Sequence, residues 1–242
     1  MQTGGACVIL MLKFAGKITP KERRTMDTAE IFSHIDHTLL KADSTWPQIE
    51  KLCAEAQRYG AAAVCIPPCY VRRAKEAFPA LPVSTVVGFP LGYAVTEAKL
   101  TETRQALADG ADEIDMVINI CDVKNGDYFK VQDEIDALKR ACGDKVLKVI
   151  VETCYLTREE KIALCRAVEG AGADYIKTST GFGTAGADVA DVALFRSQLP
   201  SHIRIKAAGG IRDRKTMEAL LRAGADRLGC SAGVSALYPD EA

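Results

Sequence analysis

The sequence contains few of the side chains that build metal sites, with three histidines in 242 residues. A catalytic zinc ion needs about three converging protein ligands. His34 and His37 would point to opposite sides of one predicted strand, and His202 precedes a much later strand. We therefore predict no metal site, and we expect His37 to be a structural hydrogen-bonding residue.

The chain also lacks an excess of either charge and any long apolar run. Its 31 Lys and Arg nearly balance 32 Asp and Glu, for a net charge of −1. Nucleic acids and anionic membranes bind clustered positive charge, so neither is expected as a partner. No apolar run approaches the roughly 18 residues that indicate a membrane span. The short apolar stretch 7–12 has no basic residue before it, which argues against a signal peptide.

Paired cysteine motifs are missing as well. The nine cysteines are an odd number, none forms a C-x-x-C pair, and the closest two are Cys65 and Cys69. This pattern is typical of reduced thiols. We therefore expect a cytoplasmic protein.

What the sequence does contain is a regular alternation of short apolar runs and longer amphipathic segments. The predicted strands lie within 33–38, 62–68, 83–89, 113–120, 146–152, 175–180, 203–210 and 227–233. Predicted helices between them include 47–59, 96–109, 128–142, 158–171 and 214–223. Eight strands alternating with helices, without a linker, predict an α/β protein with a single (β/α)8 TIM barrel domain over 28–242. Residues 1–27 are read as an N-terminal extension. The alternative, an open doubly wound sheet, is disfavoured because no G-x-G-x-x-G follows the first strand.

Charged residues stand at the inward-facing positions of several predicted strands. Side chains alternate along a strand, so if Ile114 and Met116 pack on helices, Asp115 points into the barrel. The same alternation turns these residues inward: Lys148, Lys177, Lys206, Asp36 and Cys65. Burying a charge that has no partner costs on the order of several kcal/mol, because the ion loses its hydration. The cluster is either a structural ion-pair network or a functional site, and convergence on four successive strands favours the site.

Clustered buried lysines suggest amine chemistry. The amine attacks a carbonyl only when unprotonated, and the ordinary pKa of lysine is about 10.4. Burial and a neighbouring cation both lower that pKa. Lys206 lies one strand beyond Lys177 at the same inward position, so we predict Lys177 as the imine-forming nucleophile and Lys206 as the cation beside it. Asp115 is the candidate general acid/base.

Glycine-rich turns follow the last three strands. They contain Gly181 and Gly183, then Gly209 and Gly210, then Gly229 with Ser231. Barrels often bind phosphate with such loops, because glycine lets backbone N–H groups approach an anion. Tight turns alone would also use glycine. Three consecutive loops beside the lysine cluster favour a phosphate site.

At these residues the chain resembles the deoxyribose-phosphate aldolase family, class I aldolases with a barrel fold. The matching segments include IDHTLL (35–40), GADEIDMVINI (110–120), YIKTSTGF (175–182) and IKAAGGIR (205–212), and the resemblance extends from about residue 30 to 233. It implies reversible cleavage of 2-deoxy-D-ribose 5-phosphate to D-glyceraldehyde 3-phosphate and acetaldehyde, in deoxyribonucleotide catabolism. It also implies no cofactor and a homodimer.

The resemblance also assigns site residues by motif. Lys177 matches the Schiff-base lysine, Lys206 the lysine that perturbs it, and Asp115 the proton-transfer acid. Positions that line the pocket in the family correspond to Asp36, Thr38, Cys65 and Lys148 here. The family's phosphate-binding turns correspond to Gly209, Gly210, Gly229 and Ser231. Two departures stand out. Phe182 occupies a position where some members carry a second lysine, and Tyr238 is not clearly equivalent to the C-terminal tyrosine of other members.

Three alternatives stay open at this point. A Schiff-base aldolase for keto acids would need an Arg or Thr to hold a carboxylate, and Arg212 is the one arginine near a late strand end. A metal-dependent aldolase would need more imidazoles. A non-catalytic sugar-phosphate-binding barrel would not need Asp115, Lys177 and Lys206 together. Cys65 is read as a small pocket thiol, because no histidine that would activate it shares its strand.

Overall fold

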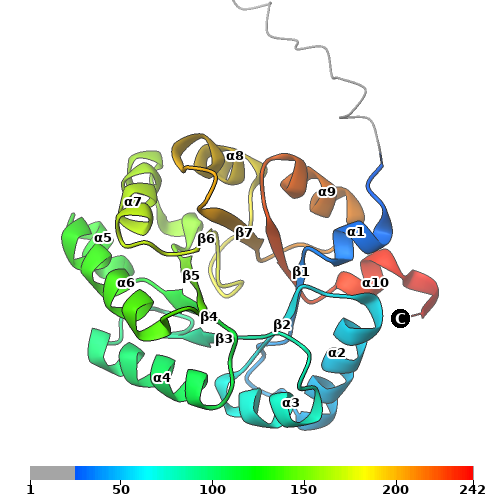
Figure 1. Cartoon of the computed structure of the whole chain (residues 1–242). Coiled ribbons are helices and arrows are strands. Elements are labelled where there is room, and N and C mark those ends of the chain that lie inside the picture. The colour runs from blue at the N-terminus through cyan, green and yellow to red at the C-terminus, as the bar shows by residue number, and fades with distance from the viewer. Residues whose placement is uncertain (1–24, 242) are drawn as a thin grey trace, which may run out of the picture.

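Eight parallel strands close into a barrel, in the order of the chain (Figure 1). The computed structural model describes residues 25–241. The strands are β1 (Ile35–Thr38), β2 (Ala63–Ile66), β3 (Val83–Val87), β4 (Glu113–Val117), β5 (Val146–Ile150), β6 (Tyr175–Lys177), β7 (Arg204–Ala208) and β8 (Arg227–Cys230). β1 pairs with both β2 and β8, which closes the sheet. Each predicted run contains one of these strands, so the TIM barrel is confirmed and the open sheet is wrong.

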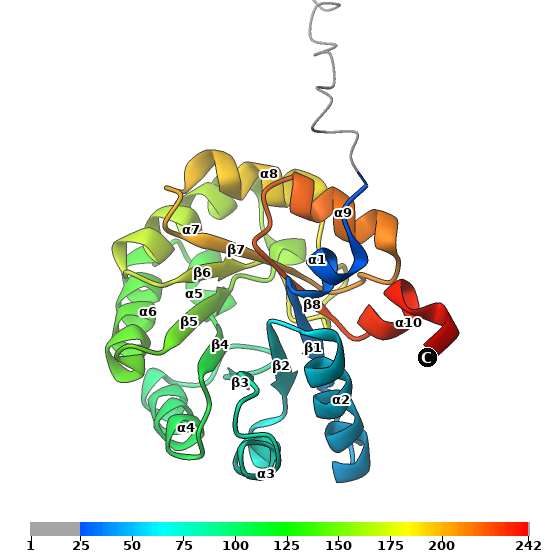
Figure 2. The same ribbon diagram turned by 45° about the vertical axis from the view of Figure 1, so that its right-hand side comes forward.

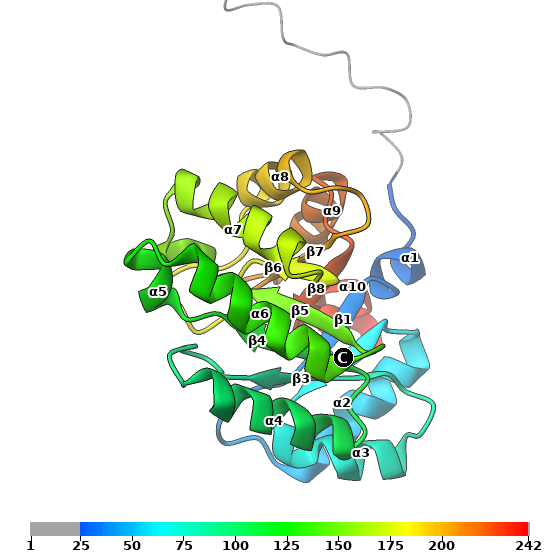
Figure 3. The ribbon, with the colours of Figure 1, turned by 60° about the vertical axis from the view of Figure 1, so that its left-hand side comes forward.

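Helices surround the strands on the outside, as Figures 2 and 3 show from two sides. They are α1 (Thr28–Phe32), α2 (Trp46–Tyr59), α3 (Val71–Ala77), α4 (Thr96–Ala108), α5 (Ile120–Lys124), α6 (Tyr128–Cys142), α7 (Arg158–Gly170), α8 (Val189–Gln198), α9 (Arg214–Arg222) and α10 (Gly233–Leu237). Short 3₁₀ turns are η2 (Pro68–Tyr70), η3 (Thr153–Tyr155) and η4 (Pro239–Glu241). The five predicted helices correspond to α2, α4, α6, α7 and α9 within one residue at each end. The sequence pattern did not single out the others, which are mostly a turn or two long.

Three helices stop at a glycine that the next strand follows at once. Gly110, Gly172 and Gly224 have φ of +101°, +68° and +111°, in the left-handed region that favours glycine. These turns share the sequence Gly-Ala-Asp, at 110–112, 172–174 and 224–226, and they lead into β4, β6 and β8.

The aspartate of each Gly-Ala-Asp turn ties its strand to the one before it. Asp112 accepts a hydrogen bond from the backbone N–H of Val83 at 3.0 Å. Asp174 and Asp226 accept in the same way from the N–H groups of Leu147 and Ile205, the second residues of β5 and β7, at 2.8 Å each. The repeated sequence therefore fixes the register of three strand pairs at the end where the strands begin.

The apolar core lies between the sheet and the helices. Outward-facing side chains such as Ile114, Met116 and Ile176 are fully buried in it. The inward-facing Asp115 and Lys148 are also fully buried, but they lie within the barrel. The predicted alternation of apolar and charged residues is thus confirmed, and it leaves the barrel interior to polar chemistry.

Most of the predicted extension, residues 1–27, lies outside the described residues. Within 25–241, no helix combines the length and apolar character needed to cross a membrane.

Candidate active site

Asp115 on β4 lies at the centre of the charged barrel interior. Its Oδ2 is 2.7 Å from the Nζ of Lys177 and 2.7 Å from the Nζ of Lys206. Its Oδ1 is 2.8 Å from the Nζ of Lys148 and accepts a hydrogen bond from Ser84 at 2.9 Å. Lys177 and Lys206 are direct neighbours in the register of β6 and β7. The structure therefore brings together the four side chains that the sequence predicted on successive strands.

A second set of charges lies toward the end of the barrel where the strands begin. Sequence reasoning missed two of them, Glu113 and Arg227. Asp36 on β1 forms ion pairs with Lys206 and with Arg227. Glu113 lies 2.5 Å from the Nζ of Lys148. Glu113 begins β4, two residues before the inward-facing Asp115, and Arg227 begins β8, next to the outward-facing Leu228. Extending the same alternation to the strand starts would have found both.

The lysines of the cluster differ in their proton affinity. Burial lowers the pKa of Lys177 below its ordinary value; Asp115 opposes this and Lys206 adds to it. Burial acts on Lys206 in the same direction, but the carboxylates of Asp115 and Asp36 outweigh it and raise the pKa of Lys206. Lys177 is therefore the amine that more readily becomes neutral, while Lys206 keeps its charge.

The carboxylates stay ionised for the converse reason. Burial would raise the pKa of Asp115, but Lys148, Lys177 and Lys206 together hold it well below its ordinary value. The pKa of Lys148 is raised, because Asp115, Asp36 and Glu113 together outweigh the effects of burial and of Lys206.

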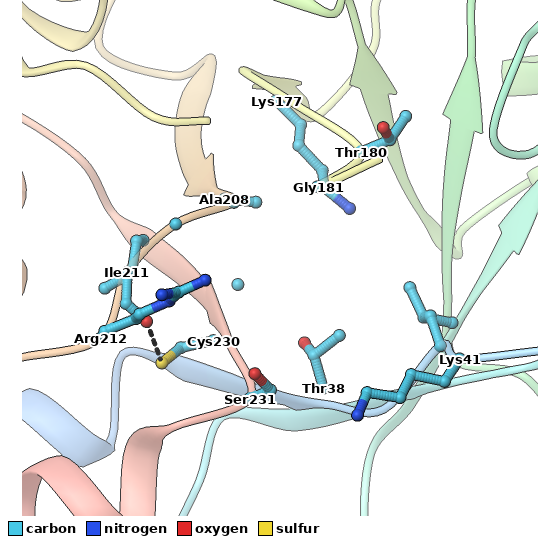
Figure 4. A pocket seen from close by; sticks show the side chains of 14 residues that line it. Thr38, Lys41, Lys177, Thr180, Gly181, Ala208, Ile211, Arg212, Cys230 and Ser231 are labelled. Atoms are coloured by element: carbon cyan, nitrogen blue, oxygen red, sulfur yellow. Dashed lines mark hydrogen bonds between the residues drawn. The ribbon is translucent and has the colours of Figure 1, made fainter. Parts of the chain in front are cut away.

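A cavity of about 330 Å³ opens beyond the carboxyl ends of the strands. Residues that line it are Thr38, Leu40, Lys41, Lys177, Thr180, Gly181, Ala208, Gly209, Gly210, Ile211, Arg212, Gly229, Cys230 and Ser231. In Figure 4 the Lys177 side chain reaches into this space from one side, with Arg212, Ser231 and Thr38 on the opposite side. The cavity therefore connects the buried lysine cluster with the three glycine turns.

Six of the predicted binding residues line this cavity: Thr38, Gly181, Gly209, Gly210, Gly229 and Ser231. Asp36, Cys65 and Lys148 instead lie buried within the barrel. Gly183 is not a lining residue. A Cβ there would lie 2.8 Å from Cys154 Sγ and 3.1 Å from Glu152 Oε1, so this glycine lets its loop pack closely on that carboxylate.

Two of the glycine loops approach each other backbone to backbone. A Cβ on Gly186 would lie 2.2 Å from the carbonyl oxygen of Gly209. The N–H of Ala187 donates to that same oxygen at 3.0 Å. Gly229 leaves room for side chains of the neighbouring strand β7. A Cβ there would lie 2.8 Å from Ala208 Cβ and 3.2 Å from Lys206 Cε.

Arg212 and Lys41 supply positive charge at the cavity wall. Sequence reasoning noted Arg212 only as a possible carboxylate-binding residue, and it missed Lys41, although a basic residue three positions after the first strand was a usable signal. Phe182 does not line the cavity. It is 55% exposed, and its ring meets the ring of Phe89 edge-on at 5.3 Å.

Three further residues noted in the sequence lie outside the cavity lining, and His37 has the structural hydrogen bond expected of it. Burial raises the pKa of the Cys65 thiol, so it stays protonated rather than serving as a nucleophile. His37 Nε2 forms a hydrogen bond of 2.8 Å with Glu55 on the helix side of β1. Tyr238 stacks on Tyr59 at 4.3 Å between ring centres, outside the barrel. Within residues 25–241, no group of three or more His, Cys, Asp or Glu is arranged to hold a metal ion.

Comparison with known proteins agrees with this geometry. The family model of the DeoC/LacD family aldolases matches residues 31–237. The chain belongs to this aldolase family. A deoxyribose-phosphate aldolase of Clostridium botulinum (strain Alaska E43 / Type E3) is 56% identical over 89% of this chain and 98% of that protein. One from Clostridioides difficile (strain 630) is 50% identical over 83% of this chain and 92% of its own length.

A solved relative has the same fold. The tetrameric deoxyribose phosphate aldolase of Aeropyrum pernix superposes with a TM-score of 0.80 and 31% identity, covering 89% of this chain and 93% of that one. The DeoC/LacD family membership makes the chain an enzyme, an aldehyde-lyase with a barrel fold.

Proposed function

We propose that this aldolase reversibly cleaves 2-deoxy-D-ribose 5-phosphate into D-glyceraldehyde 3-phosphate and acetaldehyde, through an imine on Lys177. One observation carries the proposal. Of the three interior lysines, Lys177 is the one that lines the cavity, and it is also the one whose pKa is lowered. The curated relatives at 50% identity and above are deoxyribose-phosphate aldolases, which supports the same substrate here.

The reaction begins with the neutral amine of Lys177. It adds to the aldehyde carbon C1 of the open-chain sugar phosphate, and loss of water gives a protonated imine. The C2–C3 bond then breaks, and its electron pair moves toward the imine to form an enamine. The C3 hydroxyl loses its proton, and D-glyceraldehyde 3-phosphate leaves. Protonation of the enamine carbon and hydrolysis release acetaldehyde and restore the amine.

Asp115 and Lys206 serve this sequence in different ways. Asp115 lies within hydrogen-bond distance of Lys177, so we assign it proton transfer to and from the reacting groups, through water. Lys206 remains a cation beside Lys177 and disfavours a second ammonium there. Lys148 forms an ion pair with Asp115, and Asp36 forms one with Lys206, so both help to hold this pair of residues in place. Cys65 fills the space beside them.

The phosphate is assigned to the far wall of the cavity. Gly181, Gly209 and Gly210 have φ of +88°, +88° and +74°, which only glycine adopts readily. Gly229 and Ser231 continue this wall, and Arg212 adds a guanidinium suited to phosphate oxygens. Thr38 lines the cavity on the side opposite Lys177, and its hydroxyl suits a sugar hydroxyl. Gly183 would support the loop rather than touch the substrate.

The wider setting of the activity is also a proposal. A homodimer suits the exposed apolar side chains Leu91, Tyr93 and Phe129, and a solution mass measurement would test it. A cytoplasmic role in deoxyribonucleotide catabolism fits the eight unpaired cysteines among the described residues. The aldolase domain is assigned to residues 28–242, because the family match and every strand of the barrel lie within it.

Two assays test the proposed function. Borohydride with acetaldehyde should reduce the imine to a stable adduct that peptide mass mapping finds on Lys177. Aldehyde release should be much faster from 2-deoxyribose 5-phosphate than from ribose 5-phosphate. The control variant is Lys215→Leu, a lysine-to-leucine change on the exposed surface of α9, and it should keep both the adduct and the aldehyde release. An adduct on another residue, or a barrel that binds the sugar phosphate without any adduct, would refute the imine mechanism.

A further inference from the structure

Six charged side chains inside the barrel form a closed ring in which positive and negative charges alternate. The charge ring consists of Asp115, Lys148, Glu113, Arg227, Asp36 and Lys206. Around the ring, Lys148 contacts Asp115 at 2.8 Å and Glu113 at 2.5 Å. Arg227 contacts Glu113 at 3.5 Å and Asp36 at 2.5 Å. Lys206 closes the ring through ion pairs with Asp36 and, at 2.7 Å, with Asp115.

The charge ring is balanced by itself. Its three carboxylates match its three cations, and each member contacts a group of opposite charge on both sides. Lys177 is a seventh group attached to the ring through Asp115, at 2.7 Å. A protonated Lys177 would therefore give the buried cluster one surplus positive charge. Loss of the proton from Lys177 removes that surplus charge.

Two members of the charge ring lie far from the reacting atoms. Glu113 and Arg227 are the first residues of β4 and β8, whereas the cavity opens at the opposite ends of the strands. Their side chains are 10% and 12% exposed, while the other four members are fully buried. Neither residue lines the cavity or contacts Lys177.

We propose that Glu113 and Arg227 are positioning residues that set the protonation of Lys177 from the opposite end of the barrel, by keeping the charge ring balanced. This inference rests on the proposed imine at Lys177. It assigns a function in catalysis to two residues that no contact with substrate requires.

The two residues should act in opposite directions. Glu113→Gln removes one negative charge, so the ring carries a surplus positive charge that makes Lys177 lose its proton more readily. The acid limb of the kcat/KM profile, which reports the free enzyme, should then move to lower pH. Arg227→Gln leaves a surplus negative charge, so Lys177 holds its proton and the limb should move to higher pH. Each shift should be about 0.5 to 1 pH unit, less than for a charge in direct contact with the titrating group.

The charged and titratable groups around these positions are few among the described residues. Asp115, Lys206 and Cys65 face Lys177. Besides its two partners in the charge ring, Arg227 faces the hydroxyl of Tyr175 at 3.4 Å. The guanidinium of Arg204 lies over the aromatic ring of Tyr175, 4.3 Å from its centre. Both substitutions leave these neighbours unchanged, so the comparison isolates the charge of the ring.

The experiment measures kcat/KM from pH 5 to 10 for the wild type, both single variants and the double variant Glu113→Gln/Arg227→Gln. The double variant restores the balance of charges, so its acid limb should return toward the wild-type position. Arg227→Lys keeps the charge and should leave the limb in place. The pH dependence of borohydride trapping at Lys177 should shift in the same way, and it reads out the amine directly.

The outcomes separate this inference from the proposed function. If the wild type forms no adduct at Lys177, the proposed function fails. If the adduct forms but the single variants shift in the same direction, or neither shifts, the charge-balance inference is wrong. If Glu113→Gln does not fold, the comparison of Arg227→Gln with Arg227→Lys decides alone: equal acid limbs refute the inference, and a limb at higher pH in Arg227→Gln alone supports it.

Discussion

Lys177 and Lys206 are chemically identical side chains on neighbouring strands, yet their surroundings give them different roles. Both contact the same carboxylate oxygen of Asp115. Lys206 has a second carboxylate partner in Asp36, whereas the charge-bearing end of Lys177 faces the cavity. At the scale of a single residue, the number of carboxylate partners therefore distinguishes the proposed nucleophile from the cation beside it.

Lys177→Leu should abolish turnover without unfolding the barrel. The substitution removes the imine-forming amine, while Asp115 keeps Lys148 and Lys206 as partners. We expect kcat to fall by at least about 10³-fold, as for the loss of a covalent catalyst. The measurement is aldehyde release, with circular dichroism to check the fold. Residual activity near the wild-type level would contradict the assignment of the nucleophile.

Lys206→Leu should move the acid limb of the rate profile to higher pH. Without the neighbouring cation, Asp115 acts on Lys177 with less opposition, and the pKa of Lys177 rises toward its ordinary value. The neutral amine is then formed only at higher pH, by about 1 pH unit or more. The pH profile of kcat/KM measures this, with Lys215→Leu as the surface control. An unchanged profile would mean that Lys206 has another role.

At the scale of elements, the loops after β6 and β7 form one unit because their backbones touch. Glu152 follows β5 with φ of +55°, and its buried carboxylate accepts hydrogen bonds from the N–H and the hydroxyl of Thr180. The hydroxyl of Thr180 in turn accepts from the N–H of Phe182 at 3.0 Å. Gly186 then brings the end of this loop against Gly209. The cavity wall to which we assign the phosphate thus depends on contacts between three consecutive βα loops.

Gly186→Ala tests this unit. The new methyl group would meet the backbone oxygen of Gly209, so the two loops must separate. We expect KM for the sugar phosphate to rise by about tenfold or more, with a smaller change in kcat, since binding of the phosphate is what the wall provides. Trapping of acetaldehyde on Lys177 needs no phosphate and should persist. An unchanged KM would show that this contact does not shape the phosphate site.

At the scale of the whole molecule, the barrel interior replaces an apolar filling with paired charges. Asp36 and Asp115 are fully buried, and their cationic neighbours lower the pKa of both. The folded state therefore holds fewer protons on these groups than the unfolded chain does near pH 4. Their stabilising effect is present above the ordinary aspartate pKa of about 3.9 and is lost as the pH falls below it.

The free energy of unfolding should therefore fall in acid. Urea denaturation should give a constant value from about pH 5 to 7 and a loss of a few kcal/mol, on the order of one strongly shifted carboxylate, as the pH falls below about 4. A stability that stays constant to pH 3 would contradict the assignment of buried, ionised carboxylates. At pH 9 the ion pairs of Lys206 should still stabilise the fold, because the raised pKa of Lys206 keeps that group charged.

Much of this arrangement follows from local pattern. The alternation of apolar and charged residues in β4 to β7 predicted which side chains face inward, because side-chain direction in a strand depends only on position along it. The glycine turns at 181 and 209–210 follow strands as predicted, whereas Gly229 lies within β8 and not in a turn after it. Gly183 shows its limit, since a glycine in the right loop turned out to face Glu152 rather than the cavity.

The sequence alone therefore determined the eight strands, the inward direction of Lys177, Lys206 and Asp115, and the end of the barrel where the site lies. The tertiary structure decided which charges balance one another. Asp36, Glu113 and Arg227 come from β1, β4 and β8, and they meet only because the sheet closes on itself. Electrostatic interaction depends on distance in space, so the group that becomes the surplus cation is fixed by closure of the barrel.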